Sequence, residues 1–457
     1  MSPASGGGAV PVGTLTPQGC VDDNDTGLDT CAQSTNGLGD AVAVAVSPDG
    51  RSVYVASSDD DAIVRFDRDP NTGALTPQGC VDDNDSGIDT CGQSADGLAN
   101  VRSVEVSADG RSVYAASPLD NALVRFARDP NTGALTPQGC ADDNDVSPDT
   151  CAQSADGLDG ARSVAVSSDG ASVYVVSPGD DALVRFDRDP STGALTPQGC
   201  VDDNDSGPEP CASSTDGLTA ANWVAVSPDA SSVYVVSNDD QAVVRFDRDH
   251  ATGALTAQGC IDDNDTGPDT CAQSTDGLNG GQGVAVSPDG RSVYTVTDNE
   301  DDIVRFDRDP ATGALNPQGC VDDNDPPDGP DACAQSADGL VQARAVAVSE
   351  DERSVYVAAS GDEAVVMFQR QPDPPQTKIT KKPKKKTVKQ RAKFAFRSDD
   401  PEASFECKFD RKKFKACHSP KKYRVKPGRH RFQVRGVDIW GNSDPTPAKF
   451  KWRVVEA

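Results

Sequence analysis

Short apolar runs alternate with turn-forming residues along the first 370 positions of the chain. In one representative stretch the β-rich runs are Ser103–Ser107, Ser112–Ser117, Ala122–Phe126 and Ala134–Gly139. Turns of explicit chemistry separate such runs, as in Ser47-Pro48-Asp49-Gly50, where Pro and Gly occupy the positions that a type I turn prefers. The pattern predicts an all-β fold built from sets of four short strands.

The second strand of each set is apolar on both of its faces. In Val53-Tyr54-Val55-Ala56 the two valines point to one side, and Tyr54 and Ala56 point to the other. A sheet with one face in water would alternate apolar and polar residues instead. We therefore expect sheets that are covered on both faces, as the blades of a propeller are.

The set repeats with a period of 60 residues, which the cysteines Cys20, Cys80, Cys140, Cys200, Cys260 and Cys320 mark. This repeat predicts a six-bladed β-propeller over residues 13–370. The array begins with a lone fourth strand, Gly13–Cys20, and ends after a third strand, Ala364–Arg370. Pairing of these N- and C-terminal strands would complete the last blade. A solenoid, the alternative, would need capping repeats and would not begin and end within a unit.

Charge divides the chain near Thr377. The whole sequence of 457 residues carries a formal charge of −30, but residues 377–457 hold 25 Lys and Arg against 8 acids, and residues 1–376 hold 18 Arg against 65 acids. The propeller is therefore strongly acidic and the tail basic, which makes electrostatic self-association a hypothesis. An acidic body without a nucleic-acid motif makes nucleic acid an unlikely partner. No run approaches the ~18 apolar residues of a membrane-spanning helix.

The 14 cysteines fall into seven closely spaced pairs, which predict seven disulfides: Cys20–Cys31, Cys80–Cys91, Cys140–Cys151, Cys200–Cys211, Cys260–Cys271, Cys320–Cys333 and Cys407–Cys417. Zinc sites use other spacings and His partners, and the chain has 3 His. Disulfides at this density indicate an oxidising compartment, so we expect an extracellular or cell-surface protein. The first residues, MSPASGGGAVPVG, do not have the pattern of a signal peptide.

An acidic loop follows the fourth strand of each unit and is a candidate calcium site. In Asp22-Asp23-Asn24-Asp25-Thr26-Gly27 oxygen-bearing side chains stand at positions 1, 3 and 5 with Gly at 6, the front half of an EF-hand-like loop. The bidentate Glu of position 12 is missing, and the alternative is a solvated acidic surface. The predicted ligands are Asp22, Asn24, Thr26, Asp82, Asn84, Ser86, Asp202, Asn204, Ser206, Asp262, Asn264 and Thr266.

Ser47–Ser57, SPDGRSVYVAS, followed by a run of the type ALVRFDRDPNTGALT, resembles the lactonase-type propeller family. That YVTN-like family includes 6-phosphogluconolactonase-like and carboxymuconate-cyclase-like proteins. The resemblance covers residues 13–370 and implies a propeller more firmly than it implies a chemistry. Its members often have seven blades, so six is a departure.

The tail resembles a bacterial Ig-like surface domain. The residues that carry this resemblance are Phe405-Glu406-Cys407, Phe414, Cys417, Gly428, His430, Phe432, the run Val434–Ala448 and Trp452. A small β-sandwich is expected over residues 391–457, with a start as early as 377. The Pro- and Lys-rich segment 371–390 is expected to be a linker.

Catalysis would need polar side chains that occur in only one or two of the blades. The copies are nearly identical, and the exceptions reduce to Glu105, Trp223, Glu300 and Glu363. An Arg in each third strand, such as Arg65 or Arg185, is expected to pair with neighbouring Asp. The first hypothesis is therefore a secreted or cell-surface binding or scaffold protein for a surface polymer or protein ligand, with calcium in its loops. The alternative is a lactonase-like or cyclase-like enzyme. Convergence of Glu105 with other unique side chains at the channel would favour the enzyme.

Overall fold

The computed structural model describes residues 19–24, 31–84, 91–144, 151–204, 211–264, 271–323, 333–370, 374–398, 400, 403–437 and 442–456. The chain forms two compact units, Met1–Arg370 and Gln371–Ala457. Strands and turns make up the described part of both units, which contains no helix that could span a membrane. The all-β prediction is confirmed.

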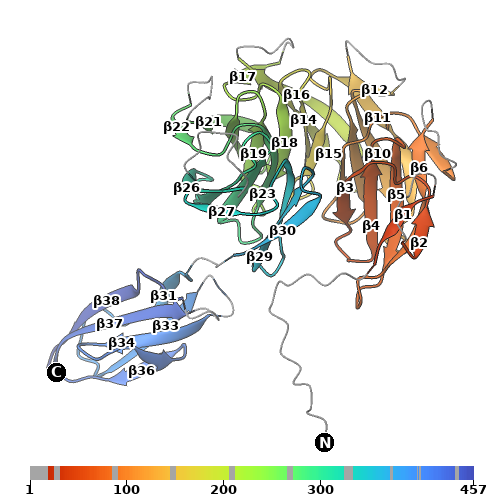
Figure 1. Cartoon of the computed structure of the whole chain (residues 1–457). Coiled ribbons are helices and arrows are strands. Elements are labelled where there is room, and N and C mark those ends of the chain that lie inside the picture. The colour runs from red at the N-terminus through yellow and green to blue at the C-terminus, as the bar shows by residue number, and fades with distance from the viewer. Residues whose placement is uncertain are drawn as a thin grey trace, which may run out of the picture. The chain divides into compact units, whose positions relative to one another are not determined.

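Six repeat sheets follow one another along the first unit, five of them with five strands and the last with three (Figure 1). The first contains β3 (Ala41–Val46), β4 (Ser52–Ser57), β5 (Ala62–Arg68), β6 (Leu75–Asp83) and β7 (Gln93–Ala95). The second contains β8 (Ser103–Val106), β9 (Ser112–Ser117), β10 (Ala122–Arg128), β11 (Leu135–Asp143) and β12 (Gln153–Ala155). The third contains β13 (Ser163–Val166), β14 (Ser172–Ser177), β15 (Ala182–Arg188), β16 (Leu195–Asp203) and β17 (Ser213–Thr215).

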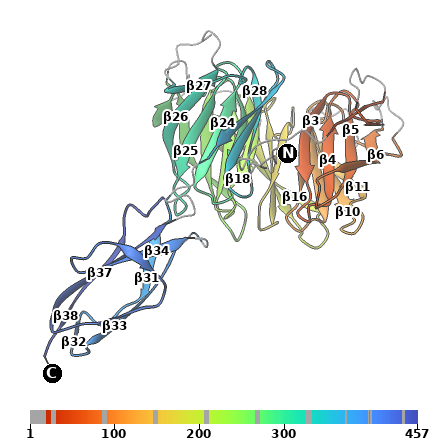
Figure 2. The same ribbon diagram turned by 60° about the horizontal axis from the view of Figure 1, so that its bottom comes forward.

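The remaining sheets of this unit continue the series. The fourth contains β18 (Ala221–Val226), β19 (Ser232–Ser237), β20 (Ala242–Arg248), β21 (Leu255–Asp263) and β22 (Gln273–Thr275). The fifth contains β23 (Gly281–Val286), β24 (Ser292–Thr297), β25 (Ile303–Arg308), β26 (Leu315–Asp323) and β27 (Gln335–Ala337). The sixth contains β28 (Ala343–Val348), β29 (Ser354–Ala359) and β30 (Ala364–Gln369). The first strands of successive sheets lie against one another, from β3 to β8 and onward to β28 (Figure 2).

Each complete sheet has five strands where the sequence predicted four. The fifth is short and parallel to the fourth, so that Val81 and Asp83 pair with Gln93 and Ala95. The disulfide Cys80–Cys91 spans the loop between these strands and folds the chain back beside the strand it has just left. All seven predicted disulfides are formed.

The second and third strands of each complete sheet are buried on both faces, as the apolar runs indicated. In β9 all six residues are buried, and Tyr114 and Phe126 have no exposed surface. Five of the core clusters combine residues of two successive sheets, so a sheet covers its neighbour rather than a core of its own. Stacking is therefore what removes the apolar faces from water.

A buried arginine fixes each junction between sheets. Arg188, which ends β15 in the third sheet, has a side chain only 1% exposed. Its Nε donates to Tyr114 Oη at 2.8 Å and its Nη2 to the Asp109 carboxylate at 3.0 Å, both in the second sheet. Tyr114 Oη in turn donates to Gly193 O of the third sheet at 2.7 Å. Equivalent arginines at the other junctions are Arg128, Arg248, Arg308 and Arg370. We call this set of contacts the arginine latch.

The two ends of the sheet series remain unpaired with each other in the described residues. The sixth sheet has three strands, and a separate two-stranded sheet pairs β1 (Val21–Asp23) with β2 (Gln33–Thr35) in the register of β6 with β7. The predicted closing strand, Gly13–Cys20, lies mostly outside the described residues. Val44 on β3 and Val365 on β30 are 66% and 60% exposed. The predicted strand closure is therefore not seen among the described residues.

The second unit is a sandwich of two sheets around one aromatic core. One sheet contains β31 (Thr377–Lys381), β33 (Arg391–Ser398) and β36 (Lys421–Arg424). The other contains β32 (Lys386–Thr387), β34 (Ser404–Phe409), β35 (Lys415–Cys417), β37 (Gly428–Val437) and β38 (Ala448–Val454). The predicted linker 371–390 thus supplies two strands, because Ile379 packs on the core and Thr377 bonds to Asp444 and Gly436. The Ig-like assignment stays a prediction.

We expect Arg188→Ala to lower the free energy of unfolding by about 3 kcal/mol, because the buried groups around Asp109 lose their partner. Arg185→Ala, in the same strand, is the matched control. Arg185 bonds to Thr252 O and pairs with the half-exposed Asp187, so its loss should cost about 1 kcal/mol. Urea unfolding with disulfides intact measures both. Equal losses would contradict a special role for the latch.

Candidate central cavity

The first strands of the sheets enclose a cavity of about 620 Å³. Strands β3, β8, β13, β18 and β28 line it, together with residues of β4, β23, β29 and β30. Most of the lining is Val and Ala, which follows from the repeat: an inner strand of the type AVAV places small apolar side chains wherever it faces. Any polar or bulky side chain here departs from the repeat.

Glu105 is such a departure. It stands in β8 at the position that is Ala45, Ala165, Ala225, Ala285 or Ala347 in the other units, and it lines the cavity. Among the described residues no group forms a hydrogen bond or ion pair with its carboxylate. Burial among apolar side chains raises the pKa of Glu105 to about 7. A carboxyl group in this state can exchange a proton near neutral pH.

Trp223 is the second departure, and it lines the same cavity from β18. The other units carry Ala43, Ser103, Ser163, Gly283 or Ala345 at this position. The ring is partly buried and packs on the core that includes Tyr234 and Val236. It therefore offers an apolar wall to the cavity while its position is fixed by packing.

Three arginines stand at the start of the inner strands, close in sequence to residues that line the cavity but not in its lining. Arg102 and Arg162 immediately precede β8 and β13, and Arg344 is the second residue of β28. Burial lowers the pKa of Arg162, and the charges of Arg102 and Arg344 lower it further, while Asp298 opposes them. Arg344 pairs with Asp298 at 2.9 Å. The group is a concentration of positive charge inside an acidic unit.

The other acids singled out from the sequence lie elsewhere. Glu300 accepts a hydrogen bond from Asn279 N at 3.0 Å, and Glu363 is exposed at the end of the turn before β30. Neither lines the cavity.

Four third-strand arginines bond to a neighbouring sheet, as Arg125 does to Thr192 O at 2.8 Å, which agrees with their structural interpretation. Arg305 pairs with Asp307 of its own strand at 2.5 Å.

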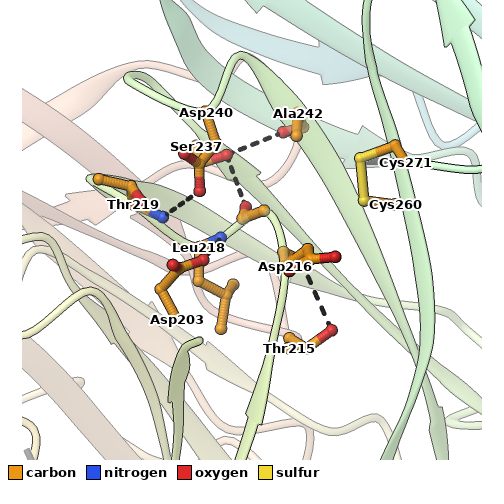
Figure 3. Close-up of a disulfide and its surroundings, with 11 residues drawn as sticks. Asp203, Thr215, Asp216, Leu218, Thr219, Ser237, Asp240, Ala242, Cys260 and Cys271 are labelled. Carbon is orange, nitrogen blue, oxygen red and sulfur yellow. Dashed lines mark hydrogen bonds between the residues drawn. A yellow bond between two sulfur atoms is a disulfide. The ribbon is translucent and has the colours of Figure 1, made fainter. Parts of the chain in front are cut away.

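Aspartates in and near the acidic loops accept hydrogen bonds from backbone N–H groups. Asp203 accepts a hydrogen bond from Leu218 N at 3.0 Å, and Asp240 accepts one from Thr219 N at 2.6 Å (Figure 3). Burial and the nearby Asp203 raise the pKa of Asp240. Asp181 reaches the next sheet and accepts from Ala220 N at 2.7 Å. Many of the aspartates that recur in the repeat are therefore hydrogen-bonded within the fold rather than free on its surface.

The described calcium candidates lie where the fourth strand ends. Asp82, Asp202 and Asp262 are buried in the strand ladder, where burial raises their pKa. Asp22 is partly buried. The backbone N–H group of Asn24 bonds to β2, and those of Asn84, Asn204 and Asn264 bond to the fifth strands of their sheets. Thr26, Ser86, Ser206 and Thr266 lie outside the described residues. Calcium binding by these loops stays a prediction.

One other acidic group has metal-like spacing in the described part of the chain. It consists of Asp302 with Cys320 and Cys333. The two sulfurs are joined in a disulfide, so they are not thiolate ligands.

The family model for the lactonase, 7-bladed β-propeller, matches residues 26–139, 86–199 and 224–328, which together span more than half of the chain. The chain belongs to this lactonase propeller family. None of the curated proteins matches it in sequence.

Solved structures agree with the fold of this lactonase-family protein. The putative 6-phosphogluconolactonase of Bacteroides uniformis ATCC 8492 is 20% identical, with a TM-score of 0.52 over 74% of this chain and 83% of that chain. The periplasmic gluconolactonase PpgL of Pseudomonas aeruginosa is 19% identical, with a TM-score of 0.51 over 75% of this chain and 84% of that chain. At these identities the likeness shows the fold alone.

Two expectations are corrected by the family. The binding or scaffold interpretation is wrong as the main function, because the family and the presence of Glu105 and Trp223 in the lining of one cavity favour the lactonase-like alternative. The predicted count of six blades also differs from the seven of the family description. The described residues of this family member contain six repeat sheets, the last of three strands.

The arginines at the start of the inner strands were missed in the sequence. The position is Val42, Arg102, Arg162, Asn222, Gln282 or Arg344 in the six units, and it reads as polar variation at a strand edge. The sequence did contain a signal. Besides His, Arg is the only basic residue type in this acidic unit, and at most other positions it recurs at the same place in successive repeats. Three arginines at one variable position therefore pointed to a local need for positive charge.

We expect Glu105→Ala to stabilise the protein in a pH-dependent way. The folded-state pKa of Glu105 is raised from 4.5 to about 7, so ionisation of the carboxyl group adds no cost below pH 4.5 and destabilises the fold increasingly as pH rises through 7. The variant should therefore be up to about 3 kcal/mol more stable than the wild type at pH 8 and nearly equal at pH 4. Urea midpoints at the two pH values check this, and a pH-independent difference would refute it.

Proposed function

We propose that this protein hydrolyses a lactone in the central cavity, with Glu105 as the general base. The observation that carries the proposal is that Glu105, the one acidic side chain among the described residues that line the cavity, is unique among the repeats and has a pKa raised to about 7. Membership of the lactonase family supports the reaction class. A base with a pKa near the working pH is suited to proton transfer.

The reaction transfers a proton from water through Glu105 to the leaving alkoxide and breaks the ring C–O bond of the lactone. The Glu105 carboxylate accepts a proton from a water molecule, whose oxygen attacks the lactone carbonyl carbon. The tetrahedral intermediate then collapses, the ring C–O bond breaks, and the protonated Glu105 returns the proton to the departing alkoxide. The product is an open hydroxy acid, and Glu105 ends as it began.

The neighbouring arginines support an anionic substrate. Arg102 lies three residues from Glu105, about 10 Å along an extended strand. Arg102, Arg162 and Arg344 can attract a carboxylate or phosphate on the substrate while its ring lies near Glu105. The wall of Trp223 suits the apolar face of a sugar ring. The names of the P. aeruginosa and B. uniformis proteins are consistent with an aldonolactone, with or without a phosphate.

The compartment is part of the proposal. Seven disulfides support an oxidising environment, so the enzyme would act outside the cytoplasm.

The test is hydrolysis of 6-phosphogluconolactone, gluconolactone and an uncharged lactone by the full chain. We expect kcat/KM to rise with pH and to level off above about 7, since only the ionised Glu105 is active. Glu105→Gln should lower kcat by about 100-fold or more. Arg162→Ala should raise KM for the charged lactone more than for the uncharged one.

Glu363→Gln is the control, because Glu363 is equally unique but exposed and away from the cavity. It should leave the rate unchanged. Glu105→Ala, which restores the residue of the other units, tests that any loss is chemical and not structural. Full activity in Glu105→Gln would exclude Glu105 as the base.

A further inference from the structure

A basic hollow lies on the second unit, outside the propeller. It has a volume of about 700 Å³, and its charged lining residues are Lys382, Lys384, Lys386, Lys389, Arg391 and Lys393. We call these six residues the basic groove. All of them are exposed.

The strands explain why the cations gather there. In β33 the side chains alternate, so Ala392 and Phe394 are buried in the core while Arg391 and Lys393 face outward. β32 pairs in parallel with β38 and brings Lys386 beside the exposed Arg453. Pro383, Thr387, Val388 and Val455 form the floor, against which the lysine stems can lie.

The positive charge of the groove is not neutralised within the described part of the unit. Two of the acids there are engaged elsewhere, Glu406 with Arg435 at 2.7 Å and Asp410 with His430 at 2.9 Å. Asp444 accepts from Thr377 N at 2.9 Å. No ion pair joins a described carboxylate to any of the six groove residues. Like charges held together in a hollow favour an anionic ligand that spans them.

We propose that the basic groove binds a flexible linear polyanion with phosphates along its backbone. Lysine acts as a point charge and suits a phosphate whose orientation is free, whereas reading of base edges relies on bidentate Arg, Asn or Gln. The groove lining contains no aromatic side chain on which a base could stack. The described aromatic rings Phe394, Phe432 and Trp452 are inside the core. The basic groove therefore recognises the charge of the polyanion and not a base sequence.

The probe is end-labelled inorganic polyphosphate, titrated with the full chain and followed by fluorescence anisotropy at several salt concentrations. For six contacts we expect log K to fall with log salt with a slope of about −4. The triple variant Lys384→Glu, Lys386→Glu, Lys389→Glu should bind at least about tenfold more weakly, with a slope nearer −2.

A matched variant separates the groove from overall charge. Lys412→Glu, Lys413→Glu, Lys415→Glu changes three exposed lysines of the same unit outside the groove, so the net charge is identical. It should keep wild-type affinity within about twofold. Equal weakening in both variants would overturn the proposal, as would equally tight binding of a polyglutamate of equal charge. Tighter binding of single-stranded DNA of equal charge would overturn it in favour of base contacts.

Discussion

The arginine latch is the interaction on which the first unit depends. A guanidinium with 0–4% of its side chain exposed must find partners for its donors, and each latch finds them in the preceding sheet. Burial alone would raise the pKa of Asp109, but bonds from Ser107, Arg111 N and Arg188 outweigh burial and lower it. Because the latch joins only neighbours, the stability of the unit is a sum of junctions.

The aspartates complete this framework and change the meaning of the charge. The acidic loops were interpreted from the sequence as calcium sites or as a solvated acidic surface. In the structure Asp203 and Asp240 bond to backbone N–H groups of one loop, and Asp181 bonds to the next sheet. A carboxylate that accepts hydrogen bonds from backbone N–H groups has a structural role. The recurring aspartates are therefore better explained by the stabilisation of loops than by cation binding.

The sequence was sufficient for most of what the repeat dictates: four strands of each sheet, the turns, the disulfides and the burial of both sheet faces. It was insufficient where copies differ. Glu105 was visible as an exception in the sequence. Arg102 and Arg344, whose charges both act on Arg162, are 242 positions apart and come near that residue only through the stacking of sheets. The fifth strand also escaped, because its pairing depends on the return of the chain across a disulfide and not on a long apolar run.

A repeat scaffold can hold such a site with little loss of stability. The inner strand positions of Glu105 and Trp223 are small in the other units, so the cavity exists before either side chain is placed in it. Tyr114, which pairs with Glu105 across β8 and β9, still completes its latch. The destabilisation by one buried carboxyl therefore stays local, while five latches hold the surrounding sheets. The symmetry of the fold supplies the stability, and the exceptions to that symmetry supply the chemistry.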